Sequence, residues 1–283
     1  MVERSGSDFL DAVYTGPIRS WIRRIGIFHA ALRAYGNFFR LLYWLDYRLR
    51  RPKTAALEAG PHSAIFIAES FPEFARIRTS GSERRIVKKF LRHLRPGDAV
   101  YDVGASIGIY TVLTARAISD KGAVVAFEPE PQSRERLLQN LALNEVNNVK
   151  VFDKGLGDKP IAARLTLTGG SFVSGAHGMF YDAPGEFADI EIIPGDALVS
   201  EMRLPLPCGV KIDVEGFEYE VLMGLRETLE KTSRCTVLIE VHFSVLENRG
   251  MSDAPRKIRT LLEGVGFTKF EWLGYSHLLA IKN

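Results

Sequence analysis

Apolar and polar positions alternate regularly along the last two thirds of the chain. Short apolar runs of strand length occur at Ala99–Val103, Ala123–Phe127, Val149–Phe152, Gly209–Val214 and Thr236–Val241. Segments with the helical spacing of apolar residues lie at Ile107–Ser119, Pro131–Asn144, Phe217–Leu229 and 252–264, and Lys269–Trp272 with His277–Ile281 predict a hairpin. This alternation predicts an α/β fold with a mainly parallel, doubly wound sheet and a C-terminal antiparallel hairpin.

The first part of the chain has a different pattern. Residues 17–51 combine basic and aromatic residues and predict helix up to Pro52, because the residue before a proline avoids the helical region. Residues 52–80 predict loops and short strands, one of them within Ala64–Ala68. We therefore expect a basic, aromatic, helical N-terminal extension over residues 1–80 and an α/β domain over residues 81–283.

Composition and charge add an expectation about partners. The 283 residues are 46% hydrophobic and 25% charged, which is ordinary for a globular protein. Residues 1–96 hold 18 Lys and Arg against 8 Asp and Glu, whereas the rest hold 19 against 26. Such asymmetry suggests an anionic partner for the first part and a site that holds a cation in the second.

The N-terminal sequence bears on localisation. The chain shows no signal peptide, and it has no apolar run of the roughly 18 residues that a membrane span needs. We therefore expect a cytoplasmic protein. The Arg and aromatic residues of 18–51 suit either packing on the α/β domain, which we favour slightly, or peripheral contact with the inner face of a membrane.

An acid and a glycine turn follow the first predicted strand, in Asp102-Val103-Gly104-Ala105-Ser106-Ile107-Gly108. A ligand of this fold lies beyond the carboxyl ends of the strands, where glycine lets the backbone approach it. The segment lacks the third glycine of a dinucleotide fingerprint. A carboxylate would repel a pyrophosphate but suits the ammonium and sulfonium of S-adenosylmethionine. We therefore expect Asp102, Gly104, Ser106 and Gly108 to bind this cofactor.

The next two strand ends carry further acids. Glu128-Pro129 ends the second strand at about the spacing from Gly104 that a ribose-binding acid has, and we favour this role over that of a surface acid. Asp158 follows the third strand and either accepts a hydrogen bond from adenine or is an ordinary turn residue, with neither favoured. We include Glu128, Pro129 and Asp158 among the candidate cofactor ligands.

The fourth and fifth strands end in the residues that we expect to act on the acceptor. In Lys211-Ile212-Asp213-Val214-Glu215, Lys211 and Asp213 share one face and suit a structural ion pair, which leaves Glu215 unexplained. Asp213 is also a candidate for the cofactor ammonium, for catalysis or for a metal. In Glu240-Val241-His242, His242 is either a hydrogen-bonded structural histidine or a base.

These segments resemble the FkbM family of methyltransferases. The resemblance rests on Pro96-Gly97-Asp98, the Asp102–Gly108 segment, Ala126-Phe127-Glu128-Pro129, Asn140 with Asn144, Lys211–Glu218 and Glu240-Val241-His242. It spans about residues 83–272, and it departs from the family at Ser106, where Asn is usual, and at Phe217, where a small residue is usual. It implies a Rossmann-like methyltransferase fold, S-adenosylmethionine as cofactor and O-methylation of sugars or small natural products.

From these observations we expect an S-adenosylmethionine-dependent methyltransferase that O-methylates a sugar, a lipid-linked saccharide or a small natural product. We expect His242 to act as general base, oriented by Glu240, with Asp213 as the alternative proton acceptor. A divalent metal at Asp213, Glu215, Glu240 and His242 stays open, and we expect no nucleic-acid partner. The alternative is a non-catalytic protein that binds membrane or nucleic acid with a methyltransferase-like scaffold.

Overall fold

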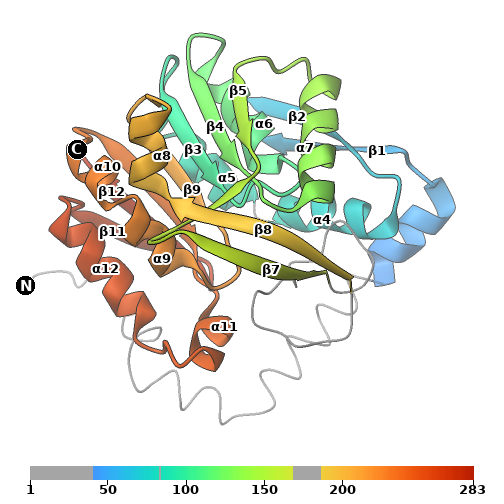
Figure 1. Ribbon diagram of the computed structural model, residues 1–283. Helices are drawn as coiled ribbons and strands as arrows, with labels where there is room; N and C mark the ends of the chain where they lie inside the picture. The colour runs from blue at the N-terminus through green and yellow to red at the C-terminus, as the bar shows by residue number, and fades with distance from the viewer. Residues whose placement is uncertain (1–40, 83, 168–185) are drawn as a thin grey trace, which may run out of the picture.

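The central element of the computed structural model is a seven-stranded sheet (Figure 1). The structure describes residues 41–82, 84–167 and 186–283. The strand order is β11-β12-β10-β9-β3-β4-β5, formed by Lys269–Leu273, His277–Lys282, Cys235–Glu240, Gly209–Ile212, Ala99–Val103, Ala123–Phe127 and Val149–Phe152. The β3, β4, β5, β9 and β10 pairs are parallel, and β12 is antiparallel to both neighbours. This is the predicted doubly wound Rossmann-like sheet with its antiparallel C-terminal hairpin.

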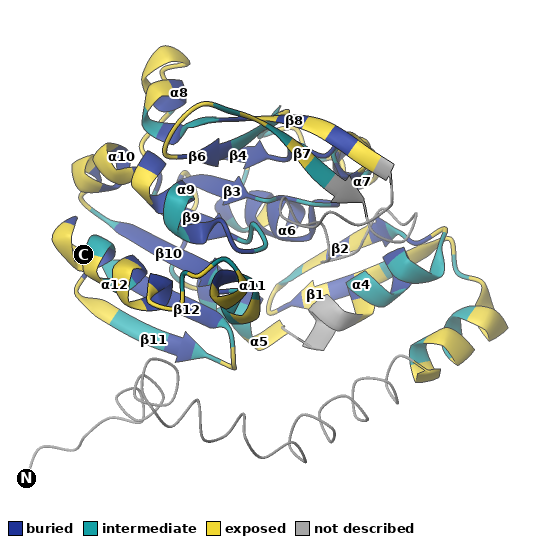
Figure 2. Cartoon of the chain, turned by 60° about the horizontal axis from the view of Figure 1, so that its bottom comes forward, coloured by how far each residue is buried: buried dark blue, intermediate teal, exposed yellow. Residues whose placement is uncertain are grey.

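Helices cover both faces of this sheet because its side chains alternate between two cores. In β3 and β4, Val100 and Val124 belong to one core while Tyr101 and Val125 belong to the other. The first core holds α5 (Arg84–Leu91), α6 (Ile109–Ile118) and α7 (Pro131–Leu143). The second holds α8 (Gly195–Glu201), α9 (Glu218–Gly224), α10 (Arg226–Lys231) and α12 (Ala254–Gly264). Figure 2 shows buried central strands between helices with exposed outer faces.

The structure differs from the predicted elements at two places. The helix predicted over Phe217–Leu229 is divided into α9 and α10, and Gly224 at the division lies so close to Gly157 that a Cβ would be 1.7 Å from the Gly157 carbonyl oxygen. The connection between the third and fourth predicted strands contains a small sheet of β6 (Lys154–Gly157), β8 (Glu186–Pro194) and β7 (Ile161–Leu167). Residues 168–185 of that connection lie outside the described residues.

A hairpin precedes the main sheet. It consists of β1 (Thr54–Ala59) and β2 (His62–Ile67) and is followed by α4 (Phe71–Ser82). Alternation places Leu57 and Phe66 in the core that α6 and α7 share, and β2 confirms the strand predicted within Ala64–Ala68. The division of the chain at residue 80 stays a prediction.

Polar side chains of α7 and α6 hold the hairpin in place. Asn140 Oδ1 accepts from Ile67 N (2.9 Å), and its Nδ2 donates to Ile107 O (2.8 Å). Asn144 accepts from Ile65 N (3.0 Å) and donates to Ile65 O (2.6 Å). The two asparagine side chains therefore form hydrogen bonds with backbone groups of β2, as the backbone of a neighbouring strand would.

Residues 41–50 form a helix before the hairpin, with exposed Leu41, Leu42, Trp44, Leu45 and Leu49. Residues 1–40, which hold most of the predicted basic and aromatic helix, lie outside the described residues. No helix in the described part of the chain is long and apolar enough to cross a membrane. Contact of residues 18–51 with a membrane stays a prediction.

We predict that Asn140→Ala lowers the free energy of unfolding by about 1–3 kcal/mol, because removal of the fully buried amide leaves two backbone groups unpaired. Urea denaturation followed by circular dichroism measures the change. Gln139→Ala, an exposed position on the same helix, is the matched control and should stay within about 0.5 kcal/mol. Equal stability of the two variants would contradict the proposed role of Asn140.

Candidate active site

A cavity of about 890 Å³, open solvent included, lies at the carboxyl ends of β3, β4 and β9. Since β3 pairs with β4 on one side and β9 on the other, this is the point where the chain order of the strands reverses, which is where open α/β sheets bind ligands. The strand ends contribute Val103, Gly104, Ser106, Phe127, Glu128, Pro129, Asp213, Val214 and Glu215. Leu165, Ile190 and Ile192 of the small sheet form an apolar wall.

Two glycines shape the turn after β3. Gly104 has φ +77°, and a Cβ there would lie 1.9 Å from the Asp213 carbonyl oxygen. Gly108 has φ +88°, and its Cβ would lie 2.3 Å from Leu137 Cδ1. Gly104 lines the cavity, whereas Gly108 does not. Gly108 is thus required for the packing of α6 against α7, and its contact with the cofactor stays a prediction.

Asp102 also lies away from the cavity. It is 2% exposed and accepts a hydrogen bond from Thr111 Oγ1 (2.5 Å), and Lys211 Nζ lies 3.6 Å from its Oδ1. Lys211 Nζ also donates to Gly104 O (2.9 Å) and to Asp213 Oδ2 (3.3 Å). Asp102 thus compensates the charge of Lys211, which joins the ends of β3 and β9, and its contact with the cofactor stays a prediction.

Glu128 is held at the cavity wall by backbone donors. Its Oε2 accepts from Ser106 N (2.6 Å) and its Oε1 from Glu130 N (2.9 Å). Burial raises the pKa of Glu128 to about 7, although these two bonds oppose the shift. A carboxylate has about four acceptor sites, so two remain for a ligand. Ser106 has φ +50°, a region that Asn tolerates better than Ser, which agrees with the Asn usual in the family pattern.

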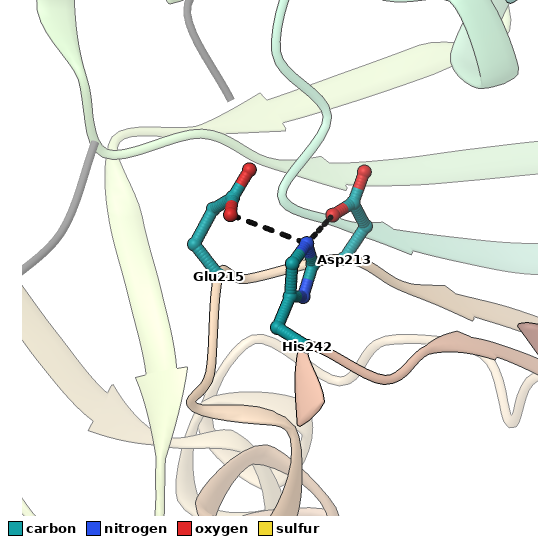
Figure 3. Close-up of side chains that lie close together, drawn as sticks. All are labelled: Asp213, Glu215 and His242. Atoms are coloured by element: carbon teal, nitrogen blue, oxygen red, sulfur yellow. Dashed lines mark ion pairs between the residues drawn. The ribbon is translucent and has the colours of Figure 1, made fainter. Parts of the chain in front are cut away.

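Asp213 and Glu215 line the cavity, and the side chain of His242 lies beside both of them (Figure 3). His242 Nε2 lies 3.2 Å from Glu215 Oε2 and 3.7 Å from Asp213 Oδ1. Glu215 has φ +52° and precedes Gly216 with φ +97°. This tight turn after β9 directs the Glu215 carboxylate toward the imidazole.

The protonation of this cluster follows from its charges. Burial raises the pKa of Glu215 to about 7. Burial alone would lower the pKa of His242, but the Glu218 hydrogen bond with the Asp213 and Glu215 charges raises it to about 10. Burial disfavours the charged form of Asp213 too, yet Lys211, His242 and Arg76 hold its pKa below the ordinary value. At neutral pH the cluster has a cationic imidazole between two carboxyl groups, of which Glu215 is the readier proton acceptor.

The catalytic roles of His242 and Glu240 stay predictions, and the contacts of the two residues favour another arrangement. His242 is a cation and has no free lone pair, which disfavours it as general base. Glu240 does not orient it, because β10 ends at Glu240 and the alternation of side chains ends there too. Glu240 instead lies 3.5 Å from His277 Nε2. Fully buried Glu218 contacts His242 Nδ1 at 2.7 Å and itself accepts from Gly216 N (2.8 Å).

Two further positions differ from the sequence reasoning. Asp158 is exposed and does not line the cavity, since β6 ends at Gly157 and the chain turns outward there. Its exposure agrees with the alternative of an ordinary turn residue, and its contact with adenine stays a prediction. Arg76 lines the cavity although it lies in the predicted N-terminal extension. A basic residue in a helix carries no sequence signal of this kind, so its place follows only from the docking of α4.

The cluster also has the donor set of a cation site. One ligand atom each from Asp213, Glu215 and His242 lies within 4.8 Å of the others. The same three groups compensate one another as ion pairs when His242 is protonated. The geometry is therefore compatible with both states, and metal dependence stays an open prediction.

Comparisons with known proteins agree with this site. Residues 102–269 match the family model of the methyltransferase FkbM domain. Hexuronic acid methyltransferase AglP of Haloferax volcanii is 30% identical, over 73% of this chain and 82% of that protein. 31-O-demethyl-FK506 methyltransferase FkbM of Streptomyces tacrolimicus is 29% identical, over 63% of this chain and 77% of that protein.

Solved structures match more distantly. A SAM-dependent methyltransferase from Aquifex aeolicus has a TM-score of 0.41 and 15% identity, over 70% of this chain and 86% of that chain. Precorrin-6y C5,15-methyltransferase from Geobacter metallireducens has a TM-score of 0.43 and 14% identity, over 72% and 88%. The fold assignment rests on the strand order of the central sheet.

S-adenosylmethionine is the cofactor, and the cavity residues fit its parts. Glu128 offers free acceptor sites for hydroxyl groups, and the small sheet offers apolar side chains for a flat base. Asp213 and Glu215 offer carboxylates for an ammonium group. Gly104, Ser106, Glu128, Pro129 and Asp213 line the cavity as expected, and their assignment as cofactor ligands stays a prediction.

We predict that Glu128→Gln weakens the binding of S-adenosylhomocysteine about tenfold to a hundredfold, because charge-assisted hydrogen bonds contribute about 1.5–3 kcal/mol. Isothermal titration calorimetry measures the dissociation constant. Glu135→Gln, exposed on α7, is the matched control. Unchanged affinity in a folded Glu128→Gln protein would exclude the ribose-binding role.

Proposed function

The chain belongs to the FkbM methyltransferase family, as its sequence motifs predicted, and from this premise we propose that it O-methylates a hydroxyl group of a saccharide or a small natural product. The observation that carries the proposal is the carboxyl group of Glu215 at the cavity, with a pKa near 7 and a cationic imidazole beside it. A hydroxyl must lose its proton as it is methylated, and a base with this pKa suits that task at neutral pH.

The names of the two relatives support the acceptor class. One is named for a hexuronic acid, which is a sugar acid, and the other for an oxygen, position 31-O, of a natural product. An oxygen acceptor agrees with a site that offers a proton acceptor of raised pKa. The chain covers more than two thirds of both relatives.

The residues then divide the work as follows. Bound S-adenosylmethionine supplies the methyl group in an already activated form. Glu215 accepts the proton of the acceptor hydroxyl, while His242, held by Glu218, keeps the Glu215 carboxylate ionised and in place. The apolar wall of the small sheet excludes water. Positioning of the acceptor supplies most of the remaining rate.

We predict that Glu215→Gln lowers single-turnover methyl transfer about 10²–10⁴-fold and leaves the affinity for S-adenosylhomocysteine nearly unchanged. Transfer of a tritiated methyl group to a panel of free uronic acids and p-nitrophenyl glycosides identifies a working acceptor and gives the rate. Glu135→Gln, exposed on α7 and outside the cavity, is the matched control. Mass spectrometry and NMR of the product locate the methyl group, and a methylated nitrogen or carbon would contradict O-methylation.

The pH dependence of the same rate gives a separate prediction. Below pH 7 the Glu215 carboxyl is protonated and accepts no proton, so the rate should fall about tenfold per pH unit. Above pH 7 the rate should reach a plateau, because Glu215 is then ionised while His242, with a pKa of about 10, stays cationic. Glu215→Gln should abolish the dependence near pH 7. A dependence that survives in this variant would assign the base to another group.

A further inference from the structure

We propose that Arg76 and Asp213 together bind the amino-acid end of the cofactor, with the Arg76 guanidinium on its α-carboxylate and the Asp213 carboxylate on its α-ammonium. Arg76 lies in α4, outside residues 102–269 that match the family model. The inference requires that S-adenosylmethionine binds and does not require that the acceptor is a hydroxyl. It makes the hairpin and α4 part of the cofactor site.

The helix that carries Arg76 is held firmly at its start. Ser70 and Glu73 form a reciprocal cap, in which Glu73 Oε2 accepts from Ser70 N (2.9 Å) and Ser70 Oγ accepts from Glu73 N (3.4 Å). Glu73 is buried, and its Oε1 lies 2.7 Å from Arg136 Nε of α7. Arg136 also lies 3.1 Å from Glu69 Oε2. Because α7 directly follows β4 and Glu128, the same helix positions both Glu128 and the start of α4.

The guanidinium of Arg76 retains donors for a ligand. Its side chain is 30% exposed and lines the cavity. Its Nη2 lies 3.8 Å from Asp213 Oδ2, which is longer than a hydrogen bond. Its charge also acts on Glu215 and Lys211. A guanidinium has five N–H donors in a planar fork, which matches a carboxylate in two-point contact.

Asp213 does not need Arg76 as a structural partner. Its charge is already compensated by buried Lys211, which donates to Oδ2 at 3.3 Å, and by His242. A partly exposed ion pair without a hydrogen bond contributes little to stability. The arrangement is instead a cation and an anion side by side at the cavity, with the charge pattern opposite to that of an α-amino acid zwitterion.

Two parts of the cavity lining therefore differ in charge. Glu128 has free acceptor sites suited to uncharged hydroxyl groups and lies beside Glu130, whose carboxylate caps α7, whereas Arg76 and Asp213 form a bipolar pair in another part of the lining. A cofactor that carries hydroxyls on one part and a zwitterion on another would bind in one orientation only. The pair would thus fix the direction in which the sulfonium faces the acceptor.

Calorimetry with three ligands tests each half of the pair. S-adenosylhomocysteine carries carboxylate and ammonium, its decarboxylated form S-adenosyl-3-thiopropylamine carries the ammonium alone, and 5′-methylthioadenosine carries neither. Arg76→Gln should weaken S-adenosylhomocysteine about tenfold to a hundredfold and leave the other two within about twofold. Asp213→Asn should weaken the two ammonium ligands and spare 5′-methylthioadenosine.

Arg78→Gln is the matched control, because Arg78 lies two residues further on α4, is exposed, and does not line the cavity. It should leave all three affinities unchanged, and thermal melting checks the fold of each variant. Equal weakening of S-adenosylhomocysteine and the thiopropylamine by Arg76→Gln would overturn the carboxylate assignment. Unchanged S-adenosylhomocysteine affinity, with a raised KM for an acidic acceptor such as a uronic acid, would assign Arg76 to the acceptor instead. Normal binding without O-methylation would refute the proposed function alone.

Discussion

The site depends on a lysine buried where two parallel strands end side by side. Lys211 of β9 donates to the carbonyl of Gly104 after β3 and lies between the carboxylates of Asp102 and Asp213. A buried cation without partners would be costly, and Asp213, whose pKa Lys211 helps to hold low, compensates it together with Asp102. This compensation brings the β3 turn and the β9 turn together, and Gly104 allows the approach because a Cβ would overlap the Asp213 carbonyl.

A second set of polar contacts attaches the N-terminal hairpin and α4 to the same framework. Asn140 and Asn144 accept hydrogen bonds from backbone N–H groups at the edge of β2, and Arg136 forms an ion pair with Glu73 at the start of α4. These contacts give a physical reason for the two asparagines in the family motif: they bond to a segment that the family-model match does not include. Through them a helix from outside the matched region brings Arg76 to the cavity.

Charge compensation also decides the roles within the cluster after β9 and β10. An isolated histidine would be the natural base near neutral pH. Surrounded by Asp213, Glu215 and buried Glu218, the imidazole of His242 keeps its proton, and burial raises the pKa of the Glu215 carboxyl toward neutrality. The group whose pKa suits general-base catalysis near neutral pH is therefore Glu215, which faces the cavity, and not His242.

Sequence pattern alone determined the parallel sheet, its closing hairpin and the strand ends that meet at the cavity, because the run length and periodicity of apolar residues report burial directly. It placed Glu128 and Asp213 at the cavity edge for the same reason. The tertiary structure decided that Asp102 is turned to Thr111 and Lys211, that Glu218 rather than Glu240 holds His242, and that Arg76 lines the cavity. Those facts depend on contacts between residues far apart in the chain, and a charged group's pKa and partner are set by its spatial neighbours, not by its spacing in the sequence.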